Sequence, residues 1–375
     1  MEHNKLIFSK VPTLRFKQFQ DNWSSKRLSD IAEVVGGGTP DTTDSTLWNG
    51  DIQWFTPTEV GHSKYVSMSV RTISQLGLQK SSAKILPAGS ILLSSRATVG
   101  ECSIAQKDCT TNQGFQNLIP KKGINNEFLY YLAQTQKRHF IKYASGSTFL
   151  EISNSEIKKT KCAVPGIKEQ TEIATFLSAI DKKIETQNKI ISKYETLIKG
   201  LCDKIFRHDK SVCLSDLVKC KTSILQENEI ATYYNGEYNV FGASGIIASI
   251  NKYQFEDDGI LVLKDGSKAG KIQYAGGKYS VVGTSVVLIP NNAEDARYLY
   301  FAMLSIDFDK YKVGSGIPHI YFKDYSCERI YYPNSALRIR IAKVLDAYGK
   351  KVEIEKEMLS ALQKQKAFLL QSMFI

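Results

Sequence analysis

Two groups of polar loop residues hold most of the side chains that could do chemistry in this chain. Asn and Gln match the N6/N7 pair of adenine, Arg matches the O6/N7 pair of guanine, and Ser, Thr and glycine amides suit phosphates. The first half offers Gly38, Thr39, Thr56, Lys84, Ser95, Arg96, Thr111, Asn112, Gln113, Phe115, Ser147 and Thr148. The second half offers Phe241, Ser244, Lys264, Ser267, Lys268, Lys271, Thr284, Ser285 and His319. Any one of them fits an ordinary turn equally well, but the two sets recur at equivalent places around basic groups and together favour DNA binding.

Motifs for catalysis are missing from the sequence. The five histidines form no HExxH pair, and there is no GxSxG elbow, amino-methyltransferase signature or helicase-type ATPase motif. Residues 266–271 resemble a phosphate-binding P-loop but are one residue short and lead into Ile272, so we interpret them as a hairpin turn. Asp257 and Asp258 could form a nuclease cluster with Lys264, although a solvated turn before a buried strand explains them better. We therefore predict a binding protein with no catalytic residue, metal site or cofactor of its own.

The charge and the cysteines narrow the class of protein further. The net charge of +11 favours a polyanionic partner, yet residues 207–336 are close to neutral, so DNA binding there needs a local basic face. The seven cysteines are scattered without a CxxC pair, which predicts neither disulfides nor a zinc site and fits a reducing cytoplasm. We expect no transmembrane helix and no secretion signal.

Two long helices must position these loops. Apolar side chains recur with the alternating four- and three-residue steps of a coiled-coil seam. The first seam is Ile173, Leu177, Ile180, Ile184, Gln187, Ile191, Tyr194, Ile198, Leu201 and Ile205. Adding 168 gives Ile341, Leu345, Tyr348, Val352, Glu355, Leu359, Leu362, Lys366, Leu369 and Met373. About 35 residues of helix make a rod of roughly 50 Å, and such pairs usually act as spacers. Gln187 and Glu355 predict one matching polar layer, whereas two ordinary core helices are the simpler alternative.

The segments before each helix repeat as well. Leu28-Ser29-Asp30-Ile31 returns as Leu214-Ser215-Asp216-Leu217 at an offset of 186, and later glycines and Pro120 return at 170. The change of offset places an extra segment in the first half, which we assign to residues 67–80. The order is therefore domain 1–165, helix 166–208, domain 209–335 and helix 336–375, an α+β fold with internal symmetry. Parallel and antiparallel packing of the helices are both open.

Local patterns predict the main elements of the first domain. Residues 1–27 read as an irregular lead-in, and 52–55, 91–96, 102–105, 115–119 and 162–165 read as strands, with a hairpin across Gly100. Asn126 is expected to cap a helix that continues to Tyr143.

Several long stretches carry a resemblance to a known family. They are PTLRFKQFQDNWSSKRLSDIAEV (12–34), GGGTP (36–40), DIQWFTP (51–57), SSAKILPAGSILLSSRATVG (81–100), TNQGF (111–115), YNVFGASGI (238–246), DGILVLKDGSKAGK (258–271), EQTEIATFLSAIDKKIE (169–185) and RIRIAKVLDAYGKKVE (338–353). With these, both halves of the chain resemble the DNA-specificity subunits of type I restriction-modification enzymes. The second half departs more, because its helix opening has Ile339-Arg340 where the first has Glu169-Gln170.

The resemblance implies a fold and a division of labour. It implies two target-recognition domains separated by two antiparallel helices, each domain reading one half of a bipartite, asymmetric site in double-stranded DNA. It further implies a non-catalytic cytoplasmic subunit that recruits two modification subunits, and restriction subunits where these exist. S-adenosylmethionine, ATP and Mg²⁺ would then belong to the partners, which we expect to dock on outer helix faces at Phe176, Leu197 and Phe368. A self-contained DNA-modifying or DNA-cleaving enzyme and a coiled-coil scaffold that reads no sequence are the alternatives.

Overall fold

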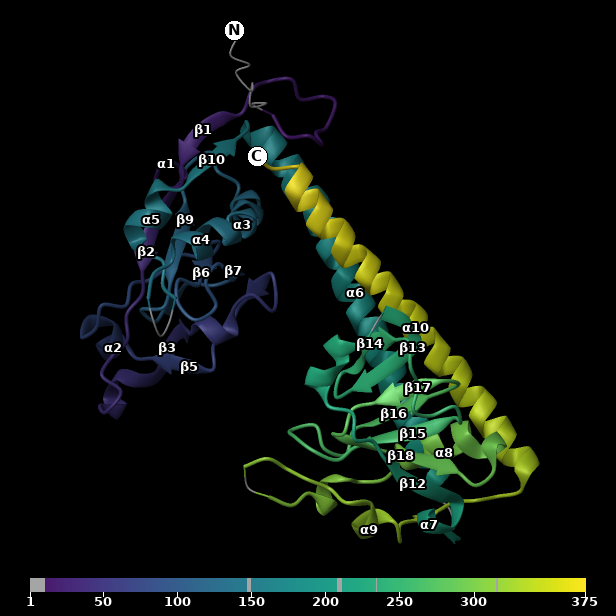
Figure 1. Cartoon of the computed structure of the whole chain (residues 1–375). Helices are drawn as coiled ribbons and strands as arrows, with labels where there is room; N and C mark the ends of the chain where they lie inside the picture. The colour runs from purple at the N-terminus through teal and green to yellow at the C-terminus, as the bar shows by residue number, and fades with distance from the viewer. Residues whose placement is uncertain (1–10, 147–149, 208–210, 234, 315) are drawn as a thin grey trace. The chain divides into compact units, whose positions relative to one another are not determined.

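The computed structural model describes residues 11–146, 150–207, 211–233, 235–314 and 316–375 (Figure 1). The chain forms two compact units. The first holds the residues up to Glu185 together with Ser360–Ile375, and the second holds Thr186–Leu359. Each unit therefore contains one globular domain and part of both long helices, α6 (Ile167–Phe206) and α10 (Ser335–Ser372).

The domain of the first unit is built on two sheets. One has the strand order β2-β9-β6-β7-β4 and the other β5-β3-β8. The strands are β1 (Ser24–Arg27), β2 (Ala32–Gly36), β3 (Trp48–Phe55), β4 (Tyr65–Val66), β5 (Arg71–Ile73), β6 (Ile91–Leu93), β7 (Cys102–Ala105), β8 (Cys109–Thr111), β9 (Gln116–Pro120) and β10 (Lys161–Val164). The helices are α1 (Leu28–Ile31), α2 (Gln75–Gln79), α3 (Asn126–Thr135), α4 (Lys137–Tyr143) and α5 (Asn154–Lys159), with short 3-10 turns η1 (Ser45–Leu47) and η2 (Pro57–Glu59).

The domain of the second unit repeats this plan. Its sheets have the orders β12-β18-β15-β16 and β14-β13-β17. The strands are β11 (Val212–Cys213), β12 (Val218–Thr222), β13 (Asn235–Gly242), β14 (Gly245–Ile250), β15 (Gly259–Leu263), β16 (Ile272–Ala275), β17 (Tyr279–Val281), β18 (Ser285–Pro290) and β19 (Arg329–Ile330). The helices are α7 (Leu214–Leu217), α8 (Ala296–Met303) and α9 (Phe322–Tyr325), with turns η3 (Glu227–Thr232), η4 (Ala293–Asp295) and η5 (Asp309–Tyr311). The same strand order in both domains confirms the internal repeat.

The two domains differ most between their third and sixth strands. In the first domain, η2, β4, β5 and α2 lie between β3 and β6, whereas β14 alone lies between β13 and β15 in the second. The extra segment that the offsets indicated is therefore a mixture of strand and helix, and it adds β4 to the edge of the larger sheet.

Buried strands and tight turns explain the hairpin of each large sheet. All residues of β6 and of β15 are buried, which is typical of strands covered on both faces. Each pairs antiparallel with the next strand, β7 or β16, as expected. The turns need Gly100 and Gly270, which have φ of +85° and +89° and lie against Lys137 and Phe308.

Within each unit, α6 and α10 run antiparallel. In the first unit Asp181 pairs with Lys366, and Ile173 and Leu177 share a core with Leu369 and Met373. In the second unit Gln187 meets Glu355, and the Tyr194 ring lies 6.5 Å from that of Tyr348. Residue numbers rise along one helix as they fall along the other, so the antiparallel arrangement holds in both units. The seam positions of both helices are buried or half-buried, as their spacing predicts.

Each domain packs against the start of one helix and the end of the other. Phe374, beyond the end of α10, stacks on Phe128 of α3 with ring centroids 5.3 Å apart. At the repeat-equivalent place, Phe206 at the end of α6 meets Tyr298 of α8 at 5.5 Å. An aromatic pair at equivalent positions thus joins each domain to a helix end, stacked in the first domain and edge-to-face in the second.

Three local expectations are wrong in detail. The lead-in contains β1, which pairs with β10, so its last residues are not irregular. The helix predicted from Asn126 to Tyr143 is interrupted at Gln136, and its cap is Asn125, whose side chain accepts a hydrogen bond from the Phe128 amide at 3.0 Å.

The helix openings also align differently from the expectation. The Gln170 side chain accepts a hydrogen bond from the Asn125 amide and donates one to the Pro165 carbonyl. At the equivalent place, the Arg338 guanidinium donates to the Asp295 carboxylate and to the Pro333 carbonyl. The counterpart of Glu169-Gln170 is therefore Leu337-Arg338, because the offset of 168 already applies there.

Candidate nucleic-acid interface

The carboxyl ends of two parallel strands form one rim of the first domain. β3 and β8 run parallel with Phe55 opposite Thr111. The residues that follow, Thr56 and Asn112, therefore lie side by side at the same edge of the sheet. The Asn112 amide donates to the Phe55 carbonyl at 3.0 Å, and the Asn112 side chain accepts from the Gly114 amide at 2.9 Å. This turn directs Gln113 to the surface.

Two further loops join this rim. The glycine loop after β2 is attached by the Gly38 amide, which donates to the Thr111 carbonyl at 2.9 Å. In the same loop, the Thr39 hydroxyl donates a hydrogen bond to the Gln113 side-chain oxygen. The loop after β6 enters through the Ser95 amide, which donates to the Gly114 carbonyl at 2.8 Å. We call this set of loops the first rim.

An exposed ion pair lies on the first rim. Arg96 and Glu151 form an isolated β-bridge, and the Arg96 Nε donates to the Glu151 carboxylate at 2.9 Å. The adjacent Ile152 amide donates to the Ser95 carbonyl at 3.0 Å, which ties this segment to the loop after β6. Glu151 thus holds Arg96 in one orientation with its guanidinium partly in solvent.

The second domain builds the equivalent rim with the same backbone bonds. β13 and β17 run parallel, and the Val282 amide donates to the Phe241 carbonyl at 3.0 Å. The Lys264 amide donates to the Thr284 carbonyl at 2.9 Å, and the Ile320 amide donates to the Lys264 carbonyl at 2.9 Å. We call these loops the second rim.

The pair equivalent to Arg96 and Glu151 has the opposite polarity on the second rim. Asp265 and His319 form the matching isolated β-bridge, and His319 Nδ1 lies 2.8 Å from Asp265 Oδ1. An acid followed by an imidazole therefore replaces a guanidinium followed by an acid. Two rims with one backbone and different side chains present different hydrogen-bonding patterns.

Comparison with known proteins agrees with the repeated architecture. A family model described as "Type I restriction modification DNA specificity domain" matches residues 20–196 and again 209–364. This chain belongs to that family. Both copies of the specificity domain include one globular domain and a large part of the helix that follows it.

Individual relatives and solved structures point the same way. The MjaIX specificity subunit of Methanocaldococcus jannaschii is 41% identical over 46% of this chain, a stretch that spans 41% of that relative's own length. The EcoprrI specificity subunit of Escherichia coli is 22% identical over 86% of each chain. The crystal structure of an S subunit from M. genitalium has the same fold, with a TM-score of 0.62 at 19% identity, covering 97% of this chain and 99% of that one.

Five of the residues that the sequence suggests for DNA contact are buried in this structure. Neighbouring residues enclose their side chains or backbones. These residues are Gly38, Ser95, Thr111, Phe115 and Ser285. Phe115, for example, packs in the core between the two sheets, and Thr111 accepts a hydrogen bond from buried Asn117 at 2.8 Å.

The other suggested residues of this specificity-domain chain are exposed or half-buried. In the first domain they are Thr39, Thr56, Lys84, Arg96, Asn112 and Gln113, and in the second they are Phe241, Ser244, Lys264, Ser267, Lys268, Lys271, Thr284 and His319. Thr56 is partly engaged, because its hydroxyl donates to the Glu59 carboxylate at 2.6 Å. Ser147 and Thr148 lie outside the residues that the structure describes.

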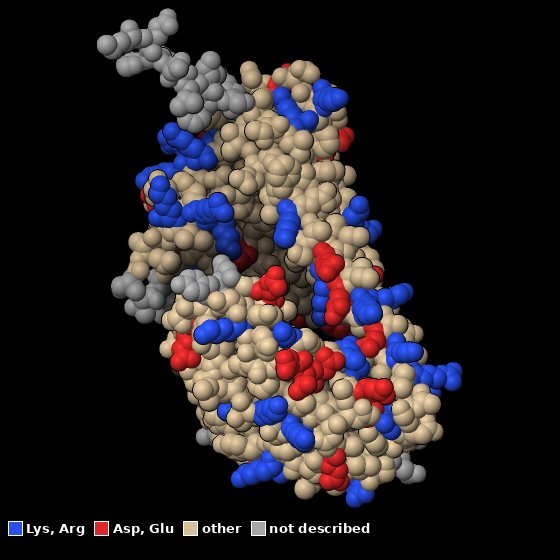
Figure 2. All heavy atoms as spheres, turned by 45° about the vertical axis from the view of Figure 1, so that its right-hand side comes forward, with Lys and Arg blue, Asp and Glu red and all other residues tan. Residues whose placement is uncertain are grey.

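Lys84 lies at a hollow next to the glycine loop that follows β2. It lines this hollow, of about 490 Å³, together with Lys121, Lys158 and Asn154, beside β2. Three ammonium groups and one carboxylate, that of Glu33, line this hollow, which leaves a net positive region that suits a phosphate better than a base edge. On the face shown in Figure 2, by contrast, basic side chains are interspersed with acidic ones over the lower body.

The sequence reasoning missed Glu151 and Asp265, which hold the two rim side chains. It had named Arg96 and His319 separately, without noticing that the repeat sets Glu151 against His319 at the offset of 168. The offset of 168 would have matched Glu151 with His319, but Arg96 and Asp265 are 169 residues apart, so only the structure shows that they are equivalent. Among the described residues, no group of His, Cys, Asp and Glu side chains could hold a metal ion, and no helix is long and apolar enough to cross a membrane.

Proposed function

We propose that this chain is a sequence-specific DNA-recognition subunit of a type I restriction-modification system. Each domain reads one half of a bipartite, asymmetric site, and the helix pair sets the gap between the halves. The observation that carries this proposal is the repeated rim, in which one backbone arrangement presents Arg96 with Glu151 in one domain and Asp265 with His319 in the other. One scaffold with two side-chain sets is what reading two different short sequences requires.

Contacts to bases and phosphates divide between the exposed residues of each rim. Arg96, Asn112 and Gln113 have the donors and acceptors to read purines, and Lys268 and Lys271 are placed to contact phosphates. The hollow with Lys84 adds a phosphate contact next to the first rim.

The chemistry belongs to partner subunits in this proposal. The chain acts in the cytoplasm without catalytic residues, and modification subunits that carry S-adenosylmethionine methylate the DNA, with restriction subunits supplying ATP- and Mg²⁺-dependent cleavage. One solved structure of the same fold, with a TM-score of 0.55 at 15% identity, comes from a study of complex assembly in a type I system. Exposed apolar side chains on the helices, Phe176, Leu197 and Phe368, are 38%, 43% and 62% exposed and offer docking points for such partners.

The recognised sequence can be read from DNA modification. Methylome sequencing of the source strain, with and without this gene, should reveal a motif of two short blocks separated by a fixed gap that vanishes when the gene is removed. The purified chain alone, incubated with DNA, S-adenosylmethionine and Mg²⁺, should neither methylate nor cleave. Turnover by the chain alone would instead support a self-contained enzyme.

The two rim pairs then provide a matched pair of variants. Arg96→Ala should relax selectivity at one half-site by about 1–3 kcal/mol per base pair read, and His319→Ala should affect the other half-site only. Methylation of substrates mutated in each half by the assembled complex measures both effects. Because exposed pairs add at most about 1 kcal/mol to stability, both variants should fold. Loss of selectivity in the same half by both variants, or in neither, would contradict the proposal.

A further inference from the structure

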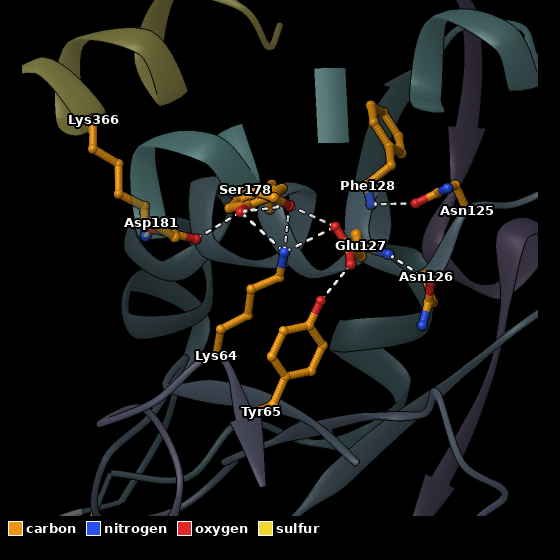
Figure 3. Close-up of polar contacts among 10 residues, drawn as sticks. Lys64, Tyr65, Asn125, Asn126, Glu127, Phe128, Ser178, Asp181 and Lys366 are labelled. Atoms are coloured by element: carbon orange, nitrogen blue, oxygen red, sulfur yellow. Dashed lines mark hydrogen bonds and ion pairs between the residues drawn. The ribbon is translucent and has the colours of Figure 1, made fainter. Parts of the chain in front are cut away.

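A cluster of polar side chains lies where the first domain meets the helices (Figure 3). Its members come from four segments that are far apart in the chain: β4 with the preceding Lys64, α3, α6 and α10. They are Lys64, Tyr65, Glu127, Tyr131, Ser178, Asp181 and Lys366. We call this set the junction cluster.

Lys64 is the centre of one branch. Its Nζ lies 2.9 Å from Glu127 Oε2, 3.2 Å from the Tyr131 hydroxyl and 2.5 Å from Ser178 Oγ. Tyr65 and Ser178 both donate hydroxyl hydrogen bonds to the Glu127 carboxylate. The ammonium group therefore joins the extra segment of the domain to α3 and to α6 at once.

Tyr131 links this branch to the second helix. Its hydroxyl donates to Asp181 Oδ2 at 2.6 Å, and Asp181 Oδ1 forms an ion pair with Lys366 Nζ at 2.7 Å. Burial and the bond to Asp181 raise the pKa of Tyr131, which keeps the phenol protonated as the donor. The second branch thus ties α3, α6 and α10 together.

The inner members of the cluster are largely shielded from water, whereas Tyr65 is 40% exposed and the Glu127 side chain 28%, and the cluster is balanced in charge. The side chains of Lys64, Lys366 and Asp181 are 10%, 20% and 18% exposed, and the two ammonium groups face two carboxylates. Hydrogen bonds to charged groups are directional and become stronger as water is excluded. Apolar contacts of the same area would tolerate sliding and rotation that this network does not.

Lys366 also interrupts the seam of α10. It occupies a position between Leu362 and Leu369 where an apolar side chain would pack directly on α6. A polar residue at a seam position typically specifies the register of a helix pair at some loss of stability. The bond to Asp181 accounts for the interruption.

The second domain has only a reduced version of this junction. Arg297 of α8, equivalent to Glu127, donates to Asp346 of α10, equivalent to Ser178, with Nε to Oδ1 at 2.6 Å. Within the described residues of the second domain, no strand takes the place of β4, and the position equivalent to Lys366 is Ile198. The fuller network is therefore a property of the first domain.

We propose that the junction cluster is a positioning device that fixes the setting of the first recognition domain on the helix pair and so restricts the gap between the half-sites. This inference rests on the proposed function. One added base pair moves a half-site by about 3.4 Å and turns it by about 35°. A domain free to rock by that amount on the helices would accept the wrong gap, and the junction cluster opposes such rocking.

The test uses the assembled complex of this chain with its modification subunits. Substrates carry the native half-sites with the native gap, one base pair fewer or one more. For Tyr131→Phe and Lys366→Gln, the preference for the native gap should fall about tenfold, equivalent to about 1.4 kcal/mol, while methylation at the native gap stays within about twofold.

Two further variants serve as controls. Lys356→Gln removes the same charge from α10 at an exposed ion pair with Glu195 and should keep the wild-type preference. Lys366→Arg retains a positively charged partner for Asp181, so its preference for the native gap should match that of the wild type. Tyr131→Phe removes one oxygen only, so it carries the test if Lys366→Gln lowers the melting temperature strongly.

The outcomes separate the two proposals. Tyr131→Phe with an unchanged gap preference, in a complex that methylates the native site normally, would overturn the positioning role alone. A wild-type complex that methylates no bipartite site would overturn the proposed function itself. A fall in gap preference that Lys356→Gln matches would show a general charge effect and would likewise overturn the positioning role.

Discussion

At the scale of residues, one carboxylate shows how the junction cluster responds to pH. Burial opposes ionisation of Glu127, but hydrogen bonds from Ser178, Tyr65 and Lys64 outweigh it and hold its pKa below the ordinary value of 4.5. A carboxyl whose pKa is lower in the folded state stabilises that state fully above its unfolded pKa. This contribution is lost as the pH falls through the lowered folded pKa.

Replacing Glu127 should therefore alter the acid side of the stability curve. Glu127→Gln should lower the free energy of unfolding at pH 7 and flatten its decline below about pH 4.5, where the Glu127 carboxyl takes up a proton in the unfolded wild-type chain before it does so in the folded one. Urea unfolding followed by tryptophan fluorescence between pH 7 and pH 3 measures this effect. The three tryptophans, Trp23, Trp48 and Trp54, all lie in the first unit.

Glu172→Gln is the control for this experiment, because Glu172 is exposed on the same unit's α6. It should leave both the stability at pH 7 and the acid decline unchanged. An identical acid decline for wild type and Glu127→Gln would show that the carboxyl does not contribute through its ionised form.

At the scale of elements, we expect the polar layer between α6 and α10 to fix the register of the two helices at some loss of stability. Gln187 donates to the Glu355 carbonyl at 3.0 Å and to the Glu355 carboxylate, and its side chain is 8% exposed. Replacing both residues with Leu should raise the stability of the second unit by about 1–4 kcal/mol, as for other buried polar pairs. The same change should allow a wider range of registers between the two helices.

Spin labels can report that alignment directly. Ser192→Cys and Lys350→Cys place labels on exposed positions of the paired helices, with exposed Cys327 changed to Ser. The distance distribution should broaden in the double Leu variant. Ile191→Leu, which keeps an apolar seam position, should leave it narrow. A narrow distribution in both variants would mean that apolar packing alone sets the register.

Sequence patterns predict some of these elements far better than others. The seam could be predicted because its spacing is local, and the strands of the large sheet because Ile91–Leu93 and Gly259–Leu263 are short apolar runs between turns. The junction cluster could not, because Lys64 and Lys366 are distant in the chain, and the break that Lys366 makes in the seam does not identify Asp181 as its partner. Burial of Ser95 and Thr111 was missed for a related reason, since polar loop residues look exposed until tertiary packing encloses them.

At the scale of the whole molecule, the repeat offers one matched pair of core substitutions. Phe374 and Phe206 occupy equivalent positions and are 6% and 2% exposed. Phe374→Ala should destabilise the first unit by about 3–5 kcal/mol through loss of its contacts with Trp23 and Phe128. Tryptophan-detected unfolding should move to a lower denaturant concentration in this variant.

Phe206→Ala is the control, because its ring contacts Tyr298 in the second unit, where no tryptophan lies. It should lower the stability of the second unit, seen by circular dichroism, and shift the tryptophan signal much less. Equal shifts of the tryptophan signal in both variants would show that the two units unfold as a single cooperative block.

The contact of Phe374 with the first domain also has a consequence for synthesis on the ribosome. The core of this domain includes Leu369, Met373 and Phe374, which are translated long after its strands. Roughly 180 residues lie between Glu185, where the first stretch of this unit ends in α6, and these three side chains. At usual rates of elongation, their translation takes about 10–40 s. Nascent chains should therefore hold the first domain incompletely closed until residues 369–374 have been translated, so that a product truncated before them lacks a closed first domain.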